Sequence, residues 1–283
     1  MESRRKVALI TGANRGVGKG IALAFAEKGY DLFLAHYGEP EKAQEVIEEI
    51  QKRFGREVHT YDCNLAVAAE VEDLFRAAVD AYGEIDVLMS NAGVGLEKYL
   101  TYTTIREMDN IYQTNYRAGI YLATMVANHM KEKKIRGSIL FTASTRGSFE
   151  VHPDDALYGG MKAALHRSAQ SLAREFAPYG IRVNTISPGC IDVNPQGHKD
   201  GSYDQQMQEI PLGRIGRGED IGYAAVFLSS EEASFITGIN LYVDGGINCG
   251  RNIGLDNPYQ MANKNISNLC FKPNALKKNP RIP

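Results

Sequence analysis

Short apolar runs alternate with longer amphipathic stretches from residue 7 to residue 244, and this alternation limits the chain to few architectures. The stretch 40–55 begins at Pro40, ends at Gly55 and repeats apolar residues every three or four positions, as a helix with one buried face does. Strands that alternate with such helices build right-handed βαβ units. The sequence therefore predicts an α/β fold: a doubly wound parallel sheet of about seven strands with helices on both faces. The expected strands are 7–11, 31–36, 57–62, 85–90, 138–143, 181–187 and 239–244.

The composition changes once along the 283 residues. Residues 1–246 contain no repeat or linker, and we predict that they form a single domain. Residues 247–283 carry eight Asn and six Lys or Arg against one acid, a local charge of 6 − 1 = +5, which leaves −2 − 5 = −7 for the remainder. This basic extension is interpreted either as a polar surface tail or as a segment that lies across a substrate mouth or a neighbouring subunit.

Charge and cysteine usage narrow the class of protein. The net charge of −2 provides no basic field for nucleic acid or an anionic membrane surface. The apolar run near the N-terminus stops at Gly12, too early for a signal peptide or a membrane span. The four cysteines, at positions 63, 190, 249 and 270, are far apart, so we expect reduced thiols in a cytoplasmic protein and no metal site.

A glycine-rich turn follows the first expected strand. Gly12, Gly16 and Gly18 stand where the strand gives way to an Ala-rich helix, in the sequence TGANRGVG. A phosphate group needs this arrangement, because absent side chains let backbone N–H groups approach it and the positive end of the helix lies behind them. The turn predicts a nucleotide-binding site.

The Gly-x-x-x-Gly-x-Gly spacing, together with Asn91-Ala92-Gly93 after the fourth strand, resembles the short-chain dehydrogenase/reductase family over residues 6–246. The resemblance implies a Rossmann-type fold, a nicotinamide dinucleotide cofactor, a small-molecule substrate and assembly as a homotetramer through the helices around residues 115 and 158 and the last strand. The cofactor contacts that it implies are Gly12, Asn14, Arg15, Gly16, Val17, Gly18, His36, Tyr37, Asp62, Cys63, Asn91, Ala92, Gly93, Tyr158, Lys162, Pro188, Gly189 and Ile191.

The end of the second strand indicates which dinucleotide binds. NAD-binding members place a carboxylate there to bond the ribose hydroxyls, and no acid lies between Asp31 and Glu39. Arg15 matches a position where NADP-binding members carry a basic residue, and a guanidinium suits a 2′-phosphate. NADP(H) is therefore favoured, with His36 as a further donor, and use of NAD(H) stays open.

Four residues match the family's catalytic tetrad in order: Asn115, Ser144, Tyr158 and Lys162. Tyr158 would exchange the proton at the substrate oxygen, with Lys162 lowering its pKa and holding the nicotinamide ribose. Ser144 would bind the substrate oxygen, and Asn115 would bind a water through its amide or backbone. The same Tyr-to-base spacing recurs at Tyr102, where no serine-ended strand precedes it.

The surroundings of Tyr158 narrow the reaction. Gly159 and Gly160 are small, as a site that admits a nicotinamide ring requires, and position 156 is Ala, where enoyl reductases carry their tyrosine. Carbonyl–alcohol chemistry is therefore favoured. The threonine that usually follows the Ser-Pro-Gly motif 187–189 is replaced near Val193 and Asn194.

A polar segment, 190–217, is expected to cover the substrate. Its composition fits a sugar, a polyol or another hydrophilic carbonyl, although exposed lids are polar whatever they cover. The residues expected near the substrate are Thr145, Arg146, Glu150, His152 and Cys190. The alternatives to an NADP(H)-dependent carbonyl reductase are an NAD(H)-dependent sugar, polyol or hydroxysteroid dehydrogenase and a non-catalytic nucleotide sensor.

Overall fold

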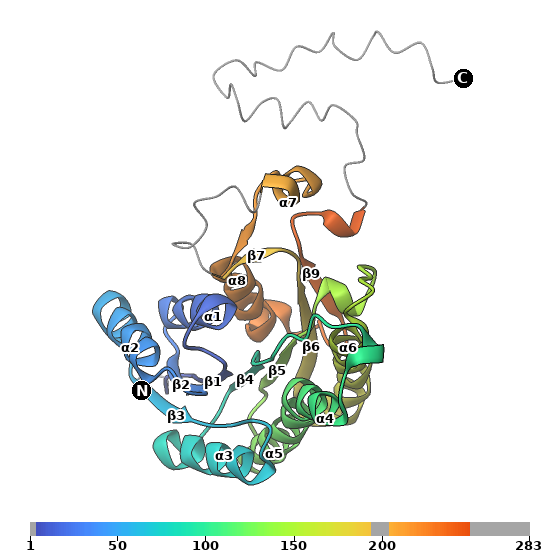
Figure 1. Cartoon of the computed structure of the whole chain (residues 1–283). Helices are drawn as coiled ribbons and strands as arrows, with labels where there is room; N and C mark the ends of the chain where they lie inside the picture. Colours follow the sequence, from blue (N-terminus) through green and yellow to red (C-terminus); the bar gives the residue numbers. More distant parts are fainter. Residues whose placement is uncertain (1–3, 194–203, 250–283) are drawn as a thin grey trace, which may run out of the picture.

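The computed structural model describes residues 4–193 and 204–249. A parallel seven-stranded sheet in the order β3-β2-β1-β4-β5-β6-β9 forms its centre (Figure 1). The strands are β1 Val7–Thr11, β2 Asp31–His36, β3 Val58–Asp62, β4 Val87–Ser90, β5 Ser138–Thr142, β6 Arg182–Pro188 and β9 Asn240–Val243. The strand order reverses between β1 and β4, which is the switch point where Rossmann-type folds bind ligands. The predicted doubly wound sheet is confirmed, with each strand end within two residues of expectation.

Helices cover both faces of the sheet (Figure 1). Helices α1 (Gly16–Glu27), α2 (Pro40–Phe54) and α8 (Gly218–Ser229) pack on one face. Helices α3 (Ala68–Tyr82), α5 (Ala118–Lys133) and α6 (Ala156–Phe176) pack on the other. All residues of β1, β2 and β5 are buried, as their apolar sequences predict, whereas the edge strand β3 has no buried residue.

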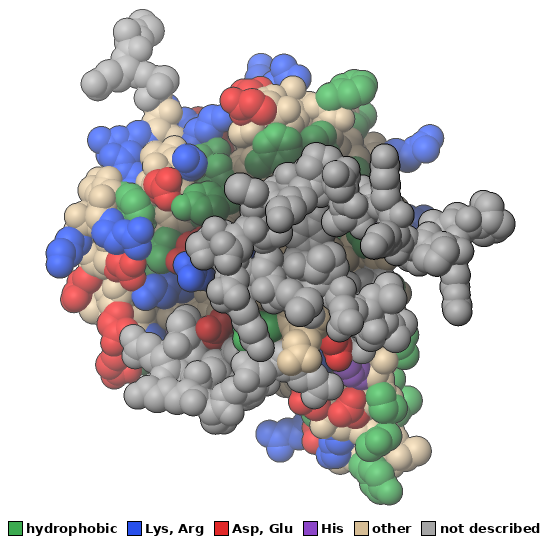
Figure 2. Space-filling view, turned by 90° about the horizontal axis from the view of Figure 1, so that it is seen from above, with side chains coloured by type: hydrophobic (Ala, Val, Ile, Leu, Met, Phe, Trp, Pro, Cys, Tyr) green, Lys and Arg blue, Asp and Glu red, His purple; other side chains and the backbone are tan. Residues whose placement is uncertain are grey.

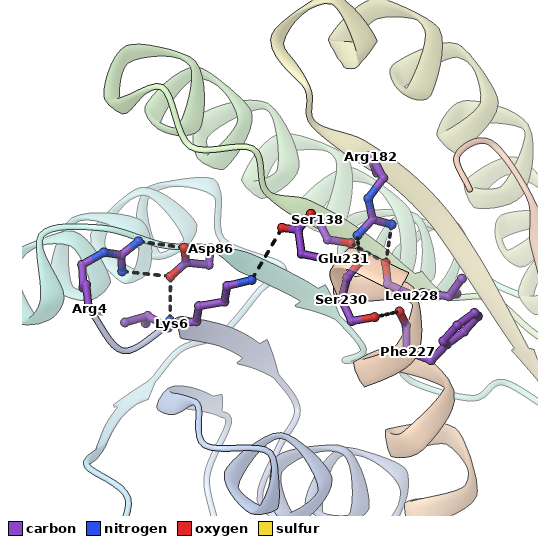
Figure 3. Close-up of polar contacts among 10 residues, drawn as sticks. Arg4, Lys6, Asp86, Ser138, Arg182, Phe227, Leu228, Ser230 and Glu231 are labelled. Carbon is purple, nitrogen blue, oxygen red and sulfur yellow. Dashed lines mark hydrogen bonds and ion pairs between the residues drawn. The ribbon is translucent and has the colours of Figure 1, made fainter. Parts of the chain in front are cut away.

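Charged side chains fix the edge of the sheet where the strands begin (Figure 3). Arg4 donates two hydrogen bonds to the Asp86 carboxylate, at 2.9 and 2.7 Å, and this carboxylate also accepts one from the backbone N–H of Val7 at 2.8 Å. Arg182 donates to the main-chain oxygens of Leu228 and Ser230, at the end of α8. Strand β4 begins just after Asp86, two residues later than expected.

Glycines let α1 and α8 approach with their backbones nearly in contact. A Cβ atom on Gly20 would lie 2.2 Å from the carbonyl carbon of Gly218, and one on Gly222 would lie 2.7 Å from the Gly20 oxygen. Since real Cβ atoms do not come so close, these positions need glycine. This helix pair was not predicted from the sequence.

The expected lid is partly described. Strand β7 (Ile191–Asp192) pairs with β8 (Gly216–Arg217), and helix α7 (Asp204–Glu209) lies between them in the sequence. Asn194 and the extension beyond residue 249 lie outside the described residues. The remaining helix labelled in Figure 1 is α4 (Ile105–Tyr112). Within the described ranges, no helix has both the length and the apolar character to cross a membrane.

Candidate active site

One large cleft contains nearly all the residues that the sequence singles out. It lies where β1, β4, β5 and β6 end, and Figure 2 views the molecule from this side, with basic and acidic side chains interspersed over the described surface. Only Asp62 and Asn115 are not part of its wall. The predicted residues that line it are Gly12, Asn14, Arg15, Gly16, Val17, Gly18, His36, Tyr37, Cys63, Asn91, Ala92, Gly93, Ser144, Thr145, Arg146, Glu150, His152, Tyr158, Lys162, Pro188, Gly189, Cys190 and Ile191.

The glycine turn has the shape of a phosphate cradle. Gly12 and Gly16 adopt φ angles of +67° and +51°, and a Cβ on Gly18 would lie 1.9 Å from the Gly12 oxygen. No side chain caps the start of α1 at Arg15, and its first turn holds no acid, within the described structure. The first N–H groups of α1 are thus available to an anion, so the turn fits the pyrophosphate of a dinucleotide.

Asn91 joins three strands beneath this cradle. Its side-chain nitrogen donates to the main-chain oxygens of Thr11 at 3.1 Å and Gly12 at 3.3 Å, and its side-chain oxygen accepts from the Thr142 hydroxyl at 3.1 Å. The amide therefore fixes β1, β4 and β5 relative to one another at the ends that face the cleft.

A carboxylate stands in the expected ribose pocket. Arg15 Nη1 lies 3.5 Å from Glu39 Oε2, and Lys42 contacts the same carboxylate. Glu39 and Lys42 line the cleft, and Glu39 has a φ of +49°, which turns the chain back toward Arg15. No acid stands at the end of β2, as predicted, but the loop that follows brings Glu39 to the cleft wall beside Arg15. The Nδ1 atom of His36 is hydrogen-bonded to the main-chain oxygen of Gly38 at 3.0 Å, so this ring nitrogen already has a partner within the protein.

At the end of β3, one of the two residues that were predicted to contact the cofactor lines the cleft and the other does not. Asp62 accepts a hydrogen bond from the Gly38 N–H at 3.1 Å and stays outside the cleft wall, so it braces the loop after β2. Cys63 does line the cleft. Burial raises the pKa of its thiol to about 12, which makes this cysteine unreactive.

Tyr158 and Lys162 lie one turn apart on α6. Lys162 Nζ is 5.5 Å from the centre of the Tyr158 ring and donates to the Thr142 oxygen at 2.7 Å. The lysine is 3% exposed, and burial lowers its pKa to about 8. Burial also raises the pKa of Tyr158, partly offset by a hydrogen bond with Ser144. The expected lowering of the tyrosine pKa is not found, because desolvation of the phenolate outweighs its polar contacts.

Ser144 stands just past the end of β5, 9% exposed, and its hydroxyl accepts a bond from the Arg146 N–H at 3.2 Å. Asn115 lies behind the cleft in a π-helical turn, Gln113–Arg117, which joins α4 directly to α5 in one uninterrupted helical stretch. Its amide donates to and accepts from the backbone of Val94, both at 2.8 Å. One donor and one acceptor site of the side chain are thus used within the protein, and a water that was expected at Asn115 would bind through its remaining amide sites or its backbone.

The two glycines beside Tyr158 have different surroundings. A Cβ on Gly159 would lie 2.7 Å from the Arg146 oxygen, whereas one on Gly160 would meet nothing within 4 Å. The expectation that both make room for a nicotinamide ring is wrong. Gly159 lets the loop after Ser144 pack against α6, and Gly160 faces open space.

Sequence reasoning missed three charged residues at this site. Glu97 and Asp155 lie 3.3 and 3.8 Å from the Arg146 guanidinium, and Glu39 contacts Arg15. Glu39 follows the strand end by three residues and was the most readily predictable of them. Glu97 and Asp155 lie on two different loops, and no spacing in the sequence predicts their contacts with Arg146.

Comparisons with known proteins agree with this geometry. A family model described as Enoyl-(Acyl carrier protein) reductase matches residues 12–248. The 3-oxoacyl-[acyl-carrier-protein] reductase FabG of Staphylococcus aureus is 35% identical over 243 residues, 86% of this chain and 98% of the relative. The chain belongs to the short-chain dehydrogenase/reductase family. Glucose 1-dehydrogenase 2 of Bacillus subtilis is 30% identical over 245 residues, 86% of this chain and 94% of that relative.

Solved structures support the same assignment. A short chain dehydrogenase from Burkholderia cenocepacia in complex with NADP has a TM-score of 0.79 and 30% identity, covering 86% of this chain and 98% of its own. Acetoin dehydrogenase YohF from Salmonella typhimurium has a TM-score of 0.81 and 26% identity, covering 89% and 99%. This short-chain dehydrogenase/reductase is therefore an NAD(P)-dependent oxidoreductase that acts on small molecules.

Proposed function

We propose that the protein interconverts a ketone or aldehyde and the corresponding alcohol with NADP(H), and that Tyr158 transfers the proton. One observation carries the proposal: Ser144, Tyr158 and Lys162 line the same cleft as the glycine turn. The bound cofactor supplies the hydride in reduction and accepts it in oxidation. Residues of the glycine turn hold its pyrophosphate through backbone N–H groups.

The four tetrad residues bind the substrate oxygen and move the proton. Ser144 holds the carbonyl oxygen near Tyr158, whose hydroxyl gives the proton in reduction and takes it back in oxidation. Lys162, protonated below a pKa of about 8, places an ammonium 5.5 Å from the Tyr158 ring and stabilises the phenolate as it forms. The backbone of Asn115, in its π-helical turn, holds a water that returns the proton from solvent.

Carbonyl reduction is favoured over enoyl reduction, although the matching family model is described by the latter. Position 156 is Ala, whereas Tyr158 precedes Lys162 by four residues on one face of α6. Two of the relatives, FabG and glucose 1-dehydrogenase 2, carry names of carbonyl–alcohol enzymes. All four tetrad positions are kept, which favours catalysis over the role of a nucleotide sensor.

NADP(H) is our proposed cofactor, and NAD(H) with a sugar, polyol or hydroxysteroid is the alternative. Arg15 and Lys42 supply two positive charges to the pocket, which suits a 2′-phosphate. Glu39, paired with both, is the group that favours NAD(H), because its carboxylate can bond ribose hydroxyls.

Exposed aromatic and aliphatic side chains support a homotetramer. Tyr99, Tyr102, Ile105, Tyr112 and Tyr121 are 55, 73, 70, 45 and 36% exposed along the segment that includes α4 and α5. A second copy that packs on this segment would bury them. Light scattering of the purified protein measures the assembly directly.

The test is turnover of NADPH by the purified protein with a panel of ketones and aldehydes. Tyr158→Phe keeps the ring and removes the proton, so kcat falls by roughly a thousandfold while NADPH affinity stays the same. Tyr102→Phe is the matched control, because Tyr102 has the same spacing to a basic residue but is 73% exposed. Full activity of Tyr158→Phe would show that the proposed mechanism is wrong.

A further inference from the structure

The substrate end of the cleft presents a wall of ionisable groups. It is built by the loop between β5 and α6, which runs directly from Ser144 into α6, and by one residue of the loop after β4. We call it the charged wall: Glu97, Arg146, Glu150 and His152 line the cleft, Thr145 bonds Glu150, and Asp155 is buried beside Arg146 behind the cleft wall.

The positive charge of this wall is already compensated. Arg146 Nη1 lies 3.3 Å from Glu97 Oε1, and Arg146 Nε lies 3.8 Å from Asp155 Oδ2. Asp155 is 4% exposed, so its contact with Arg146 is shielded from solvent. An anionic substrate would therefore meet a guanidinium that two carboxylates already face.

A separate carboxylate of the charged wall belongs to Glu150. Glu150 accepts a hydrogen bond of 2.7 Å from the Thr145 hydroxyl and lies 3.5 Å from His152 Nε2. Its side chain lines the cleft, 19% exposed. Cys190 lines the same cleft, and burial, with a smaller contribution from the charge of Glu150, raises the pKa of its thiol. Phe149 and Val151, the neighbours of Glu150 in the sequence, are not part of the cleft wall.

We propose, building on the proposed function, that Glu150 selects an uncharged hydroxy-carbonyl substrate, whose hydroxyl group donates to the Glu150 carboxylate while Ser144 and Tyr158 hold the carbonyl. An ionised carboxylate can only accept hydrogen bonds, so it binds a hydroxyl donor favourably and repels a second carboxylate. The charged wall thus rejects keto acids and other anionic carbonyl compounds. Thr145 and His152 are positioning residues, because they hold the Glu150 carboxylate.

Three four-carbon probes isolate this effect: acetoin, 2-butanone and acetoacetate, each with NADPH. Acetoin has the extra hydroxyl, 2-butanone lacks it, and acetoacetate adds a negative charge. We expect acetoin to exceed 2-butanone in kcat/KM by about tenfold to a hundredfold, the range of a hydrogen bond to a charged group, and acetoacetate to be the poorest probe.

The variant Glu150→Gln keeps the size of the side chain and removes its charge. It should bring the kcat/KM for acetoin within about threefold of that for 2-butanone and lower the KM for acetoacetate severalfold. Asp154→Asn, on the same loop but outside the cleft wall, is the matched control. Equal melting temperatures of the variants confirm that the fold is intact.

The outcomes separate the two proposals. If 2-butanone is reduced as well as acetoin, or Glu150→Gln leaves the ranking unchanged, the role of Glu150 is overturned and carbonyl reduction stands. If none of the three probes and no other carbonyl compound consumes NADPH, the proposed function falls and takes the selection by Glu150 with it.

Discussion

The ammonium nitrogen of Lys162 donates a 2.7 Å hydrogen bond to the main-chain oxygen of Thr142, from a side chain that is 3% exposed. This contact ties the helix that carries Tyr158 to the end of β5, just before Ser144. It also buries a charge for which no carboxylate partner is found in the described part of the chain, and desolvation lowers the pKa of that amine to about 8.

Lys162 should make the stability of the cofactor-free protein depend on alkaline pH. Its folded-state pKa of about 8 lies below the ordinary 10.5, so between these values the unfolded chain binds more protons. The free energy of unfolding should therefore rise with pH across this window, by up to about 3 kcal/mol (2.5 units at 1.36 kcal/mol each). Urea unfolding at pH 8 and pH 10 should show this rise in the wild type and its loss in Lys162→Met. The exposed variant Lys52→Met is the control, and equal slopes in all three proteins would contradict the assignment.

Gly159→Ala should reduce turnover, because its methyl group would lie 2.7 Å from the Arg146 oxygen and push the loop of Ser144 away from α6. We expect kcat to fall at least about tenfold. Gly160→Ala is the matched control: nothing lies within 4 Å of the new methyl group, and alanine should stabilise the exposed helix position by about 0.5–1 kcal/mol. Kinetics and thermal unfolding check both variants, and equal kcat values would show that the packing of this loop does not position Ser144.

Arg15 and Glu39 should have opposite effects on cofactor choice. Arg15→Ala should weaken NADPH binding about tenfold to a hundredfold and change NADH binding little, because only NADPH carries the 2′-phosphate. Glu39→Gln should shift preference severalfold toward NADPH, since the carboxylate 3.5 Å from Arg15 no longer competes for the guanidinium. Fluorescence titration gives both constants, with Glu41→Gln, outside the cleft wall, as the control. Equal losses for the two cofactors in Arg15→Ala would refute a 2′-phosphate role.

Asn91 should matter for stability as well as for binding. Asn91→Ala removes two donated bonds and one accepted bond among three strands, so the free energy of unfolding should fall by about 2–3 kcal/mol. Asn91→Asp keeps the shape but not the donors, and its new charge should make the loss larger at pH 7 than at pH 5. Asn128→Ala, exposed on α5, is the control, and urea unfolding measures all three. A pH-independent Asn91→Asp would argue against this bond network.

The sequence allowed the sheet to be predicted almost to the residue, because strands buried on both faces have apolar sequences and helices such as α2 carry their own start and stop signals. Pro40 and Gly55, with a φ of +60° at the latter, mark the ends of that helix in both the sequence and the structure. Strand ends were less predictable: β4 begins at Val87, two residues later than expected, although the backbone of Asp86 still bonds Val7 and Ser138 on the two neighbouring strands.

The residues of the candidate site could be predicted where a sequence motif marks their position. Positions 12, 16, 144, 158 and 162 do line one cleft. The spacing could not predict the pKa, the hydrogen-bond partners or the charged contacts of each side chain. These depend on neighbours that are distant in the chain. The Tyr158 pKa follows its burial, the Asn115 amide bonds Val94, and Glu39 reaches Arg15 through a left-handed turn.

The glycine contact between α1 and α8 has a consequence for how such enzymes diversify. Gly218 begins the helix that leaves the lid, and a Cβ there would lie 2.7 Å from the oxygen of Gly16 in the cofactor turn. At the other end of the lid, a Cβ on Gly189 would lie 2.7 Å from Asp244 Cβ, beside the last strand. Both junctions are fixed by backbone contacts that tolerate no side chain. We therefore expect that the length and composition of the stretch between them can change without disturbing the dinucleotide half of the enzyme.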